Sequence, residues 1–353
     1  MSRSIPVLAY HSISASEKMK PFLFENHLNV LTRSKLPSLL PKDLRSAEKG
    51  FLLTFDDGFT DFWTHVFPLL EQYGMHAVVF VIPSRAGEGD CRLQGVTAFP
   101  GSANQAHQEA GEKIGAHDAF LRWTELEAME ASGLVDVQSH TMHHQSFWKG
   151  DQVIGFNLGS ANNTHWSLAQ ATNGDRRPGI PLYARGSALA CRRYEDDKGL
   201  RDTLADWVEK KGGNAYINDT GVGSVEAELW KLTRDFVDTH GKKGRWETRD
   251  ERIERTKREI VDARRVLQER LGGPRDELCL PWGTYDEVTL ECARQSGIKR
   301  VYTLDRAANP AGNIDFRVNR FEPRPRGKSW LMTRLWIYRS ELRCRIYKAL
   351  SRR

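Results

Sequence analysis

The order strand, helix, strand between residues 51 and 82 constrains the fold more than any other feature of the sequence. An apolar run at 51–55 is followed by apolar residues that recur every three or four positions until Gly74. A second apolar run, rich in β-branched residues, then occupies 77–82. A helix between two strands is the usual connection between parallel neighbours, so this segment predicts a parallel sheet covered by helices.

The same alternation recurs in the rest of the chain. A short apolar run at 5–9 predicts an N-terminal strand, and Gly133, Gly272 and Gly297 each stop a helical pattern before a further strand. We therefore predict an α/β fold, a distorted (β/α) barrel. The further predicted helices are 123–131, 253–271 and 288–296, and the further predicted strands are 134–137, 278–280 and 300–303.

Three segments depart from the barrel predicted for residues 1–328. Residues 148–250 lack the alternation and are predicted to form an insertion or subdomain, and 84–119 are polar and glycine-rich and should leave the sheet. Residues 329–353 combine many cations with apolar residues at helical spacing. They predict a basic amphipathic C-terminal helix that lies on an anionic membrane surface or packs on the barrel.

Composition limits the compartment and the partners. Lys and Arg total 52 against 46 Asp and Glu, a net charge of +6 that is too mild to indicate nucleic-acid binding. Five scattered cysteines without a CxxC pair predict neither disulfides nor a cysteine-based zinc site. The N-terminus has no apolar run of signal-peptide length, so a cytoplasmic location is predicted, with peripheral attachment to the inner face of the membrane as an alternative.

Polar residues follow several predicted strands, where parallel sheets bind ligands. Asp56 and Asp57 should point to different sides, so that one can bind a metal and the other accept a proton; an ordinary Asp-Gly turn is the alternative. His140 and His144 would share one face of a helical turn and, with a carboxylate, would suit zinc; a solvated loop is the alternative, and His143 is a weaker candidate. The isolated histidines are predicted to be structural or surface residues: His65, His76, His107, His117, His165 and His240.

These residues and their surroundings resemble the polysaccharide deacetylases of the NodB-homology, carbohydrate esterase 4 type. The segments TFDDG at 54–58 and HTMHH at 140–144 stand in the order and spacing of that family. The opening VLAYHSIS and the later CLPWGTY are similar to the permuted branch that deacetylates poly-N-acetylglucosamine. The resemblance covers the N-terminal strand and residues 51–83, 120–147 and 252–321.

The resemblance implies a metal-dependent hydrolase that removes N-acetyl groups from an amino-sugar glycan or a lipid-linked glycan precursor. Asp57, His140 and His144 would hold a divalent metal, with Zn²⁺ as the first choice and other divalent transition metals as alternatives. Asp56 would be the general base for the water that the metal activates, and His11 the general acid for the leaving amine. A turn would line the sugar pocket and supply a backbone donor to the oxyanion, through Pro281, Trp282, Gly283 and Tyr285.

The sequence also departs from the family pattern. The usual Arg of the third motif is absent from 278–285, and no Leu-x-His motif occurs in 329–353. Arg320 is predicted to replace the missing motif arginine at the substrate site, as a partner of Asp56. His11 is predicted to replace the histidine of the missing Leu-x-His motif. A hydrolase of another C–N bond or of an O-acetyl ester, and a non-catalytic glycan-binding module, stay open as alternatives. On a lipid-linked substrate, a phosphate is predicted to meet arginines of the insertion: Arg176, Arg177, Arg185, Arg192 and Arg193.

Overall fold

The computed structural model describes residues 3–96, 101–110, 118–159 and 166–350. It divides into two compact units, and each is described by itself. Unit 1 consists of Met1–His144 and Lys257–Arg353, and unit 2 of Gln145–Thr256. The segment predicted as an insertion, 148–250, falls within unit 2.

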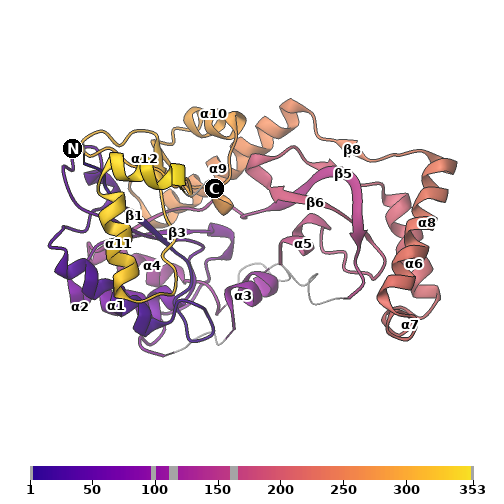
Figure 1. Ribbon diagram of the computed structural model, residues 1–353, viewed down its shortest axis with the longest axis horizontal. Helices are drawn as coiled ribbons and strands as arrows, with labels where there is room; N and C mark the ends of the chain where they lie inside the picture. Colours follow the sequence, from indigo (N-terminus) through magenta and orange to yellow (C-terminus); the bar gives the residue numbers. More distant parts are fainter. Residues whose placement is uncertain (1–2, 97–100, 111–117, 160–165, 351–353) are drawn as a thin grey trace. The chain divides into compact units, whose positions relative to one another are not determined.

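A parallel sheet forms the centre of unit 1 (Figure 1). Within the described residues its strand order is β1, β2, β3, β4, β9, β10, β11, and neighbouring strands are parallel. Phe321, the second residue after β11, closes the sheet onto β1: the Ala9 N–H donates to its carbonyl at 2.9 Å, and its own N–H donates to Val7 O at 3.1 Å. The nearly closed sheet confirms the predicted barrel. Its strands are β1 Val7–Tyr10, β2 Leu52–Phe55, β3 Ala77–Val81, β4 Val135–Ser139, β9 Glu277–Cys279, β10 Arg300–Thr303 and β11 Arg317–Asn319.

Helices cover the outside of this sheet with their apolar faces. In α1, Phe24, Leu28 and Leu31 follow one another at intervals of four and three, and all are fully buried. Gly74 ends α2 in the left-handed conformation with φ 59°, which a residue with a side chain adopts only at a cost. The helices of unit 1 are α1 Pro21–Arg33, α2 Phe67–Tyr73, α3 Ala103–Ala110, α4 Trp123–Ala131, α10 Glu287–Gln295, α11 Lys328–Tyr338 and α12 Glu341–Leu350, with the shorter turns η1 Pro41–Asp43, η2 Phe62–Val66, η3 Pro83–Arg85 and η6 Pro281–Gly283.

The C-terminal segment forms two helices where the sequence predicts one. The break between α11 and α12 lets one face of both helices enter the core, where Leu331, Leu335 and Cys344 are buried. In Figure 1, α11 lies beside α1. The opposite face leaves large apolar side chains at least half exposed: Met332, Trp336, Leu342, Ile346 and Leu350.

Unit 2 has its own apolar core. Its helices α6 and α8 pack together through buried residues that include Leu204, Val208 and Leu229. The strands pair antiparallel, β5 with β6 and β7 with β8. The elements are β5 Ser146–Phe156, α5 Trp166–Ala171, β6 Pro181–Ser187, η5 Ala188–Ala190, β7 Tyr194–Glu195, α6 Lys198–Lys210, α7 Asn214–Thr220, α8 Val222–His240 and β8 Arg245–Trp246, and α9 Arg249–Leu271 continues into unit 1.

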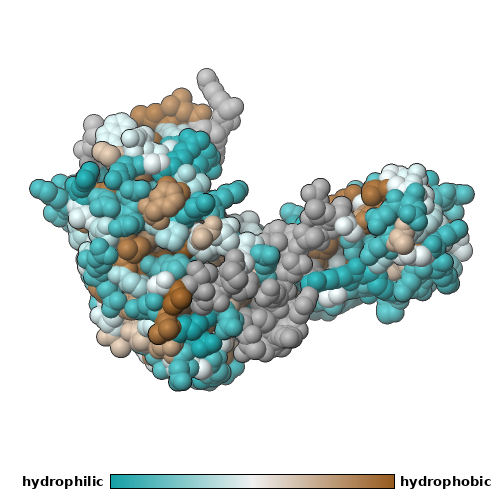
Figure 2. All heavy atoms as spheres, turned by 90° about the horizontal axis from the view of Figure 1, so that it is seen from below, coloured by the Kyte–Doolittle hydropathy of each residue, from teal (hydrophilic) through white to brown (hydrophobic). Residues whose placement is uncertain are grey.

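The face of the chain seen in Figure 2 is mainly hydrophilic, with separate apolar patches. Across the described ranges, no helix combines the length and the apolar character needed to span a bilayer. The structure places these cysteines as free thiols: Cys91, Cys191, Cys279, Cys292 and Cys344.

Candidate metal-dependent active site

The residues singled out by the sequence gather at one edge of the sheet of unit 1. His11 follows β1, Asp56 follows β2, His140 follows β4 and Arg320 follows β11. All strands of the sheet run in the same direction, so their carboxyl ends open on a single edge. Residues that are far apart in the sequence therefore meet there.

Asp57, His140 and His144 form a group with the geometry of a metal site. The Oδ1 atom of Asp57 lies 3.4 Å from His140 Nε2 and 3.7 Å from His144 Nε2. All three side chains are buried, and Oδ1 has no hydrogen-bond partner among the residues that the structure describes. Two zinc ligands, each about 2.1 Å from the ion at a tetrahedral angle, stand about 3.4 Å apart. The observed spacing therefore fits a divalent cation held by these three residues.

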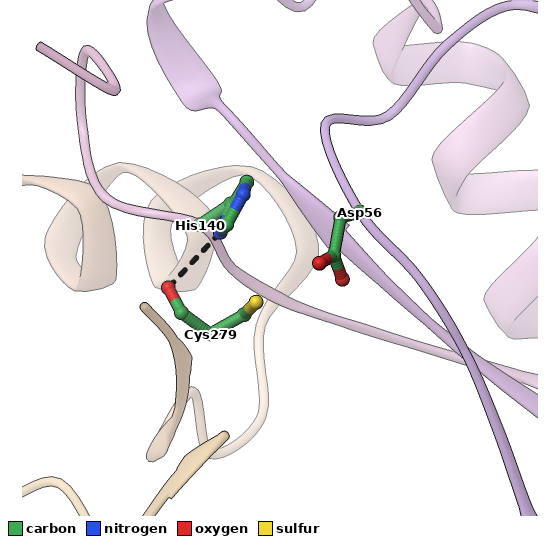
Figure 3. A group of neighbouring side chains, drawn as sticks. All are labelled: Asp56, His140 and Cys279. Atoms are coloured by element: carbon green, nitrogen blue, oxygen red, sulfur yellow. Dashed lines mark hydrogen bonds between the residues drawn. The ribbon is translucent and has the colours of Figure 1, made fainter. Parts of the chain in front are cut away.

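The orientation of His140 is set by the strand next to it. Its Nδ1–H donates to the carbonyl oxygen of Cys279 at 3.0 Å, as Figure 3 shows, so Nε2 presents its lone pair to the Asp57 side. Asp56, His140 and Cys279 form a second compact group. The polar atoms of that group already have protein partners, because Arg320 donates to both oxygens of Asp56 and to Cys279 Sγ. The Asp57 group is therefore the better metal site.

The loop 140–144 differs from the helical turn that the sequence predicts. The His140 N–H donates to Val81 O at 2.8 Å, which continues the sheet contact of β4 and keeps the chain out of a helix. Thr141 and His144 then take left-handed backbone angles, with φ of 68° and 52°. This tight loop still brings the rings of His140 and His144 to a centroid distance of 4.7 Å.

The charges of the group suit a cation. Burial alone would raise the pKa of Asp57, but the adjacent imidazoles of His140 and His144 outweigh burial, and the pKa lies well below its usual range. Burial lowers the pKa of His144 well below its ordinary value, which keeps the imidazole neutral and able to bind metal. Gly58 is required beside Asp57, because it has φ 74° and a Cβ would approach Val81 Cγ1 to 2.9 Å.

Asp56 is held by Arg320 and stays ionised. The guanidinium donates to Asp56 Oδ1 at 2.6 Å and to Oδ2 at 2.9 Å, and its Nε donates to the carbonyl of Thr303 at 3.2 Å. Burial alone would raise the pKa of Asp56, but the Arg320 charge outweighs it and the pKa is lowered. Arg320 is only 1% exposed, so its guanidinium orients Asp56 and does not face the solvent side where a substrate would enter.

His11 lies on the other side of the same carboxylate. Its Nε2 is 3.8 Å from Asp56 Oδ2, and its side chain is 41% exposed. The loop that carries it is anchored by Asp61, which accepts a hydrogen bond from Ser12 Oγ at 2.8 Å and another from the Ile13 N–H. Burial raises the pKa of Asp61 to about 6. His11 can therefore reach both Asp56 and a bound molecule.

His107 also belongs to this site, although the sequence analysis placed it among the structural or surface residues. It is buried on α3 with its Nε2 3.4 Å from Asp57 Oδ2, and Arg85 donates to its Nδ1. An arginine offers only donors, so Nδ1 must accept, and Nε2 carries the proton that faces Asp57. His107 thus orients the metal-binding carboxylate. The residue stands in the polar segment 84–119 with no partner at motif spacing, so no local pattern indicates its role.

Trp282 borders the metal group on its open side. It stands in η6 with φ 55°, and its ring centroid is 4.4 Å from that of His144. The side chain is 36% exposed, so part of the aromatic ring reaches the surface beside the metal group. His117 and His165 of the predicted structural or surface set lie outside the described residues.

The rest of the turn is held by internal contacts. Gly283 has φ 63°, its N–H donates to Leu280 O at 2.8 Å, and a Cβ there would meet Leu304 at 2.6 Å. The hydroxyl of Tyr285 bonds to Asp305, next to the strand β10. These contacts fix the position of Trp282 relative to the histidines.

Comparison with known proteins agrees with this fold. Residues 44–176 match the polysaccharide deacetylase family. The sequence is 24% identical over 185 residues to YxkH of Bacillus subtilis, a provisionally named polysaccharide deacetylase, with 48% of this chain and 61% of that protein covered. It is 23% identical over 163 residues to the poly-β-1,6-N-acetyl-D-glucosamine N-deacetylase of Escherichia coli K12, with 46% of this chain and 18% of that protein covered.

The fold is similar to that of a de-N-acetylase from Aggregatibacter actinomycetemcomitans, with a TM-score of 0.58 at 17% identity over 94% of this chain and 98% of that one. IcaB from Ammonifex degensii gives a TM-score of 0.53 at 18% identity over 95% and 97% of the chains. The barrel is therefore similar in fold to these deacetylases, and residues 44–176 are similar in sequence to the polysaccharide deacetylase family. The match to the polysaccharide deacetylase family extends over residues 44–176, and the chain spans 61% and 18% of the lengths of the two curated relatives.

Proposed function

We propose that the protein is a metal-dependent N-deacetylase of an amino-sugar glycan or of a lipid-linked glycan precursor. The observation that carries the proposal is the convergence of Asp57, His140 and His144 beside a carboxylate, Asp56, that Arg320 keeps ionised. The similarity to a poly-β-1,6-N-acetyl-D-glucosamine N-deacetylase supports this class of substrate. Zn²⁺ is the proposed ion, because two imidazoles and one carboxylate suit it and leave a position open.

The proposed chemistry assigns a separate task to each side chain. A divalent cation in this site would polarise the acetyl carbonyl and make a water acidic enough to attack it near neutral pH. Asp56 receives a proton from the attacking water, and Arg320 holds the carboxylate in place for that transfer. His107 restrains Asp57, so the three ligands keep their geometry while the substrate binds.

His11 is proposed as the acid that protonates the leaving nitrogen. An amine is a poor leaving group, so the tetrahedral species returns to substrate unless its nitrogen gains a proton. His11 is the partly exposed titratable group next to Asp56, which lets it meet a bound sugar. Trp282 is proposed to stack on the sugar ring beside it.

Acetate release tests the proposal against its alternatives. We expect the zinc-loaded protein to release acetate from N-acetylglucosamine oligomers and to lose this activity when a chelator removes the metal. Faster release from O-acetylated sugars than from N-acetylated ones would favour the esterase alternative. Bound metal with no acetate from any acetylated sugar would favour a glycan-binding module.

Replacing His11 by Ala should slow amide substrates by roughly 10²–10⁴-fold and activated acetate esters much less, because an ester oxygen leaves with little help from an acid. The measurement is kcat on an N-acetylated sugar and on an aryl acetate with the same preparation. An equal loss on both substrates would argue against the acid role of His11.

We also propose that α11 and α12 place the protein on an anionic membrane surface. Their outer face exposes Met332, Trp336, Leu342, Ile346 and Leu350. The same helices carry Lys328, Arg334, Arg339, Arg343, Arg345 and Lys348 in or beside them, against one acid, Glu341. Such a face suits the boundary between headgroups and acyl chains. With the cytoplasmic location predicted from the sequence, this would be the inner face of the membrane.

In flotation with phosphatidylglycerol vesicles, we expect the full chain to be bound. The double variant Trp336→Gln/Ile346→Gln should reduce the bound fraction at least about tenfold, because each large apolar side chain contributes about 1.5–3 kcal/mol when it is buried. Point variants are used in place of a deletion of α11 and α12, because these helices also supply buried core residues. Ile154→Gln/Val261→Gln removes two exposed apolar side chains elsewhere and should leave binding unchanged. If both double variants float with the vesicles to the same extent, the proposed membrane contact of α11 and α12 is wrong.

A further inference from the structure

A second concavity of unit 1 lies beside the ends of β10 and β11. Its volume is about 310 Å³, which is enough for a small ligand. The walls come from the segment after β10, the segment after β11, and the two C-terminal helices. Its lining includes Arg320, the residue that holds Asp56, so the pocket lies behind the proposed base.

The pocket has an excess of positive charge. Arg306, Arg320, Arg324 and Arg334 line it, together with a single acid, Glu322. Arg320 is neutralised by Asp56. The other three arginines have no carboxylate within ion-pair distance in the part of the chain that the structure describes, so three cations share this concavity with one anion. Their mutual repulsion is relieved by an anionic ligand.

Aromatic rings hold one of these arginines in place. The guanidinium of Arg334 lies 5.1 Å from the ring centroid of Trp330 and 4.6 Å from that of Tyr347. Stacking on these rings fixes the plane of the Arg334 guanidinium and leaves the N–H groups at its edge available to an oxyanion. Guanidinium groups bind phosphate oxygens in pairs, which gives this kind of pocket a preference for phosphate.

Two of the arginines of unit 2 that the sequence suggested for a phosphate, Arg177 and Arg192, have partners within unit 2. Arg177 pairs with Asp175, Asp202 and Asp206. Arg192 donates to the carbonyl of Glu247 at 2.6 Å. These two guanidinium groups are therefore already held by other residues of unit 2.

We propose that this pocket binds a phosphate or phosphodiester group through Arg306, Arg324 and Arg334. The pocket stands at the edge of the sheet that carries the metal group and is built partly from α11 and α12. A lipid-linked amino sugar could present its phosphate here while its acetyl group reaches Asp57. That the anion belongs to the substrate rests on the proposed function, whereas the anion site itself does not.

Binding of inorganic pyrophosphate, followed by isothermal titration calorimetry on the full-length protein, tests the site without requiring catalysis. Arg306→Gln/Arg324→Gln should weaken binding at least about tenfold, because each replacement removes a charge-assisted hydrogen bond. These residues are exposed on the rim and pack no core, so the variant should fold normally. Pyrophosphate can also bind a metal, but both replacements leave the metal ligands unchanged.

Arg33→Gln/Arg45→Gln is the matched control. It removes the same charge from two exposed arginines that do not line the pocket, and it should bind pyrophosphate as the unaltered protein does. An unchanged affinity in the pocket variant, or an equal loss in the control, would overturn the proposal. Competition then identifies the source: displacement by N-acetylglucosamine 1-phosphate indicates a sugar phosphate, and displacement by phosphatidylglycerol vesicles alone indicates a lipid headgroup.

The two proposals can fail separately. If the protein releases acetate from N-acetylglucosamine oligomers and the pocket variant binds pyrophosphate unchanged, only the anion site is wrong. If pyrophosphate binding depends on Arg306 and Arg324 while no acetylated sugar releases acetate, only the proposed function is wrong.

Discussion

Asp56→Asn should reduce acetate release by roughly 10²–10⁴-fold while the bound metal stays in place. The amide keeps the volume of the side chain and an oxygen for Arg320, but it cannot receive a proton from water. Asp57, His140 and His144 are unchanged, so the metal content should equal that of the unaltered protein. Acetate release and metal content by mass spectrometry are measured on one preparation.

Stability must be followed in the same experiment, because the substitution leaves the buried Arg320 charge beside a neutral group. Breaking a buried ion pair commonly costs about 3–5 kcal/mol, so activity is compared well below the melting midpoint of the variant. The control is Asp136→Asn, which makes the same change near the start of β4, at the opposite end of the sheet from the site. Normal turnover by a folded Asp56→Asn protein would show that Asp56 is not the base.

His140→Ala should abolish both metal binding and activity. It removes one of three proposed protein ligands, and the buried Asp57 then faces a cavity in place of an imidazole. Loss of a residue that only supports a ligand usually lowers metal affinity 10–100-fold, so we expect a decrease of at least about 100-fold for the ligand itself. A competitive titration with a zinc chelator measures this affinity directly.

His143→Ala supplies the matched control from the same loop. The His143 ring turns away to Glu259, with Nδ1 and Oε1 2.7 Å apart, and it is about half exposed. This variant should therefore keep its metal. Retained metal in His140→Ala, or metal loss in His143→Ala alone, would show that the ligand assignment is wrong.

The sheet was largely predictable because its strands are buried on both faces. The run at 77–82, for example, is apolar, short and preceded by a helix-ending glycine, and β3 spans Ala77–Val81. The helix predicted at 123–131 is α4, Trp123–Ala131. The meeting of Asp57 and His140 was also predictable, because each follows a strand of a parallel sheet and the carboxyl ends of such strands lie at one edge.

The parts that were missed depend on contacts between distant residues. His107 is placed by Arg85 and Asp57, and nothing in the residues around it indicates this. The loop after β4 was predicted to be helical from the spacing of its histidines, but the bond from His140 to Val81 favours the left-handed turn. The break between α11 and α12 arises because both helices must turn the same face to the core.

The most direct test of the central claim is a crystal structure of the zinc-loaded protein, with the metal located by anomalous scattering. We predict one peak about 2.0–2.2 Å from an oxygen of Asp57 and from Nε2 of His140 and of His144, with Asp56 outside the coordination sphere. A fully occupied metal bound elsewhere, or a fully loaded protein whose Asp57 stays out of reach of both imidazoles, would contradict it.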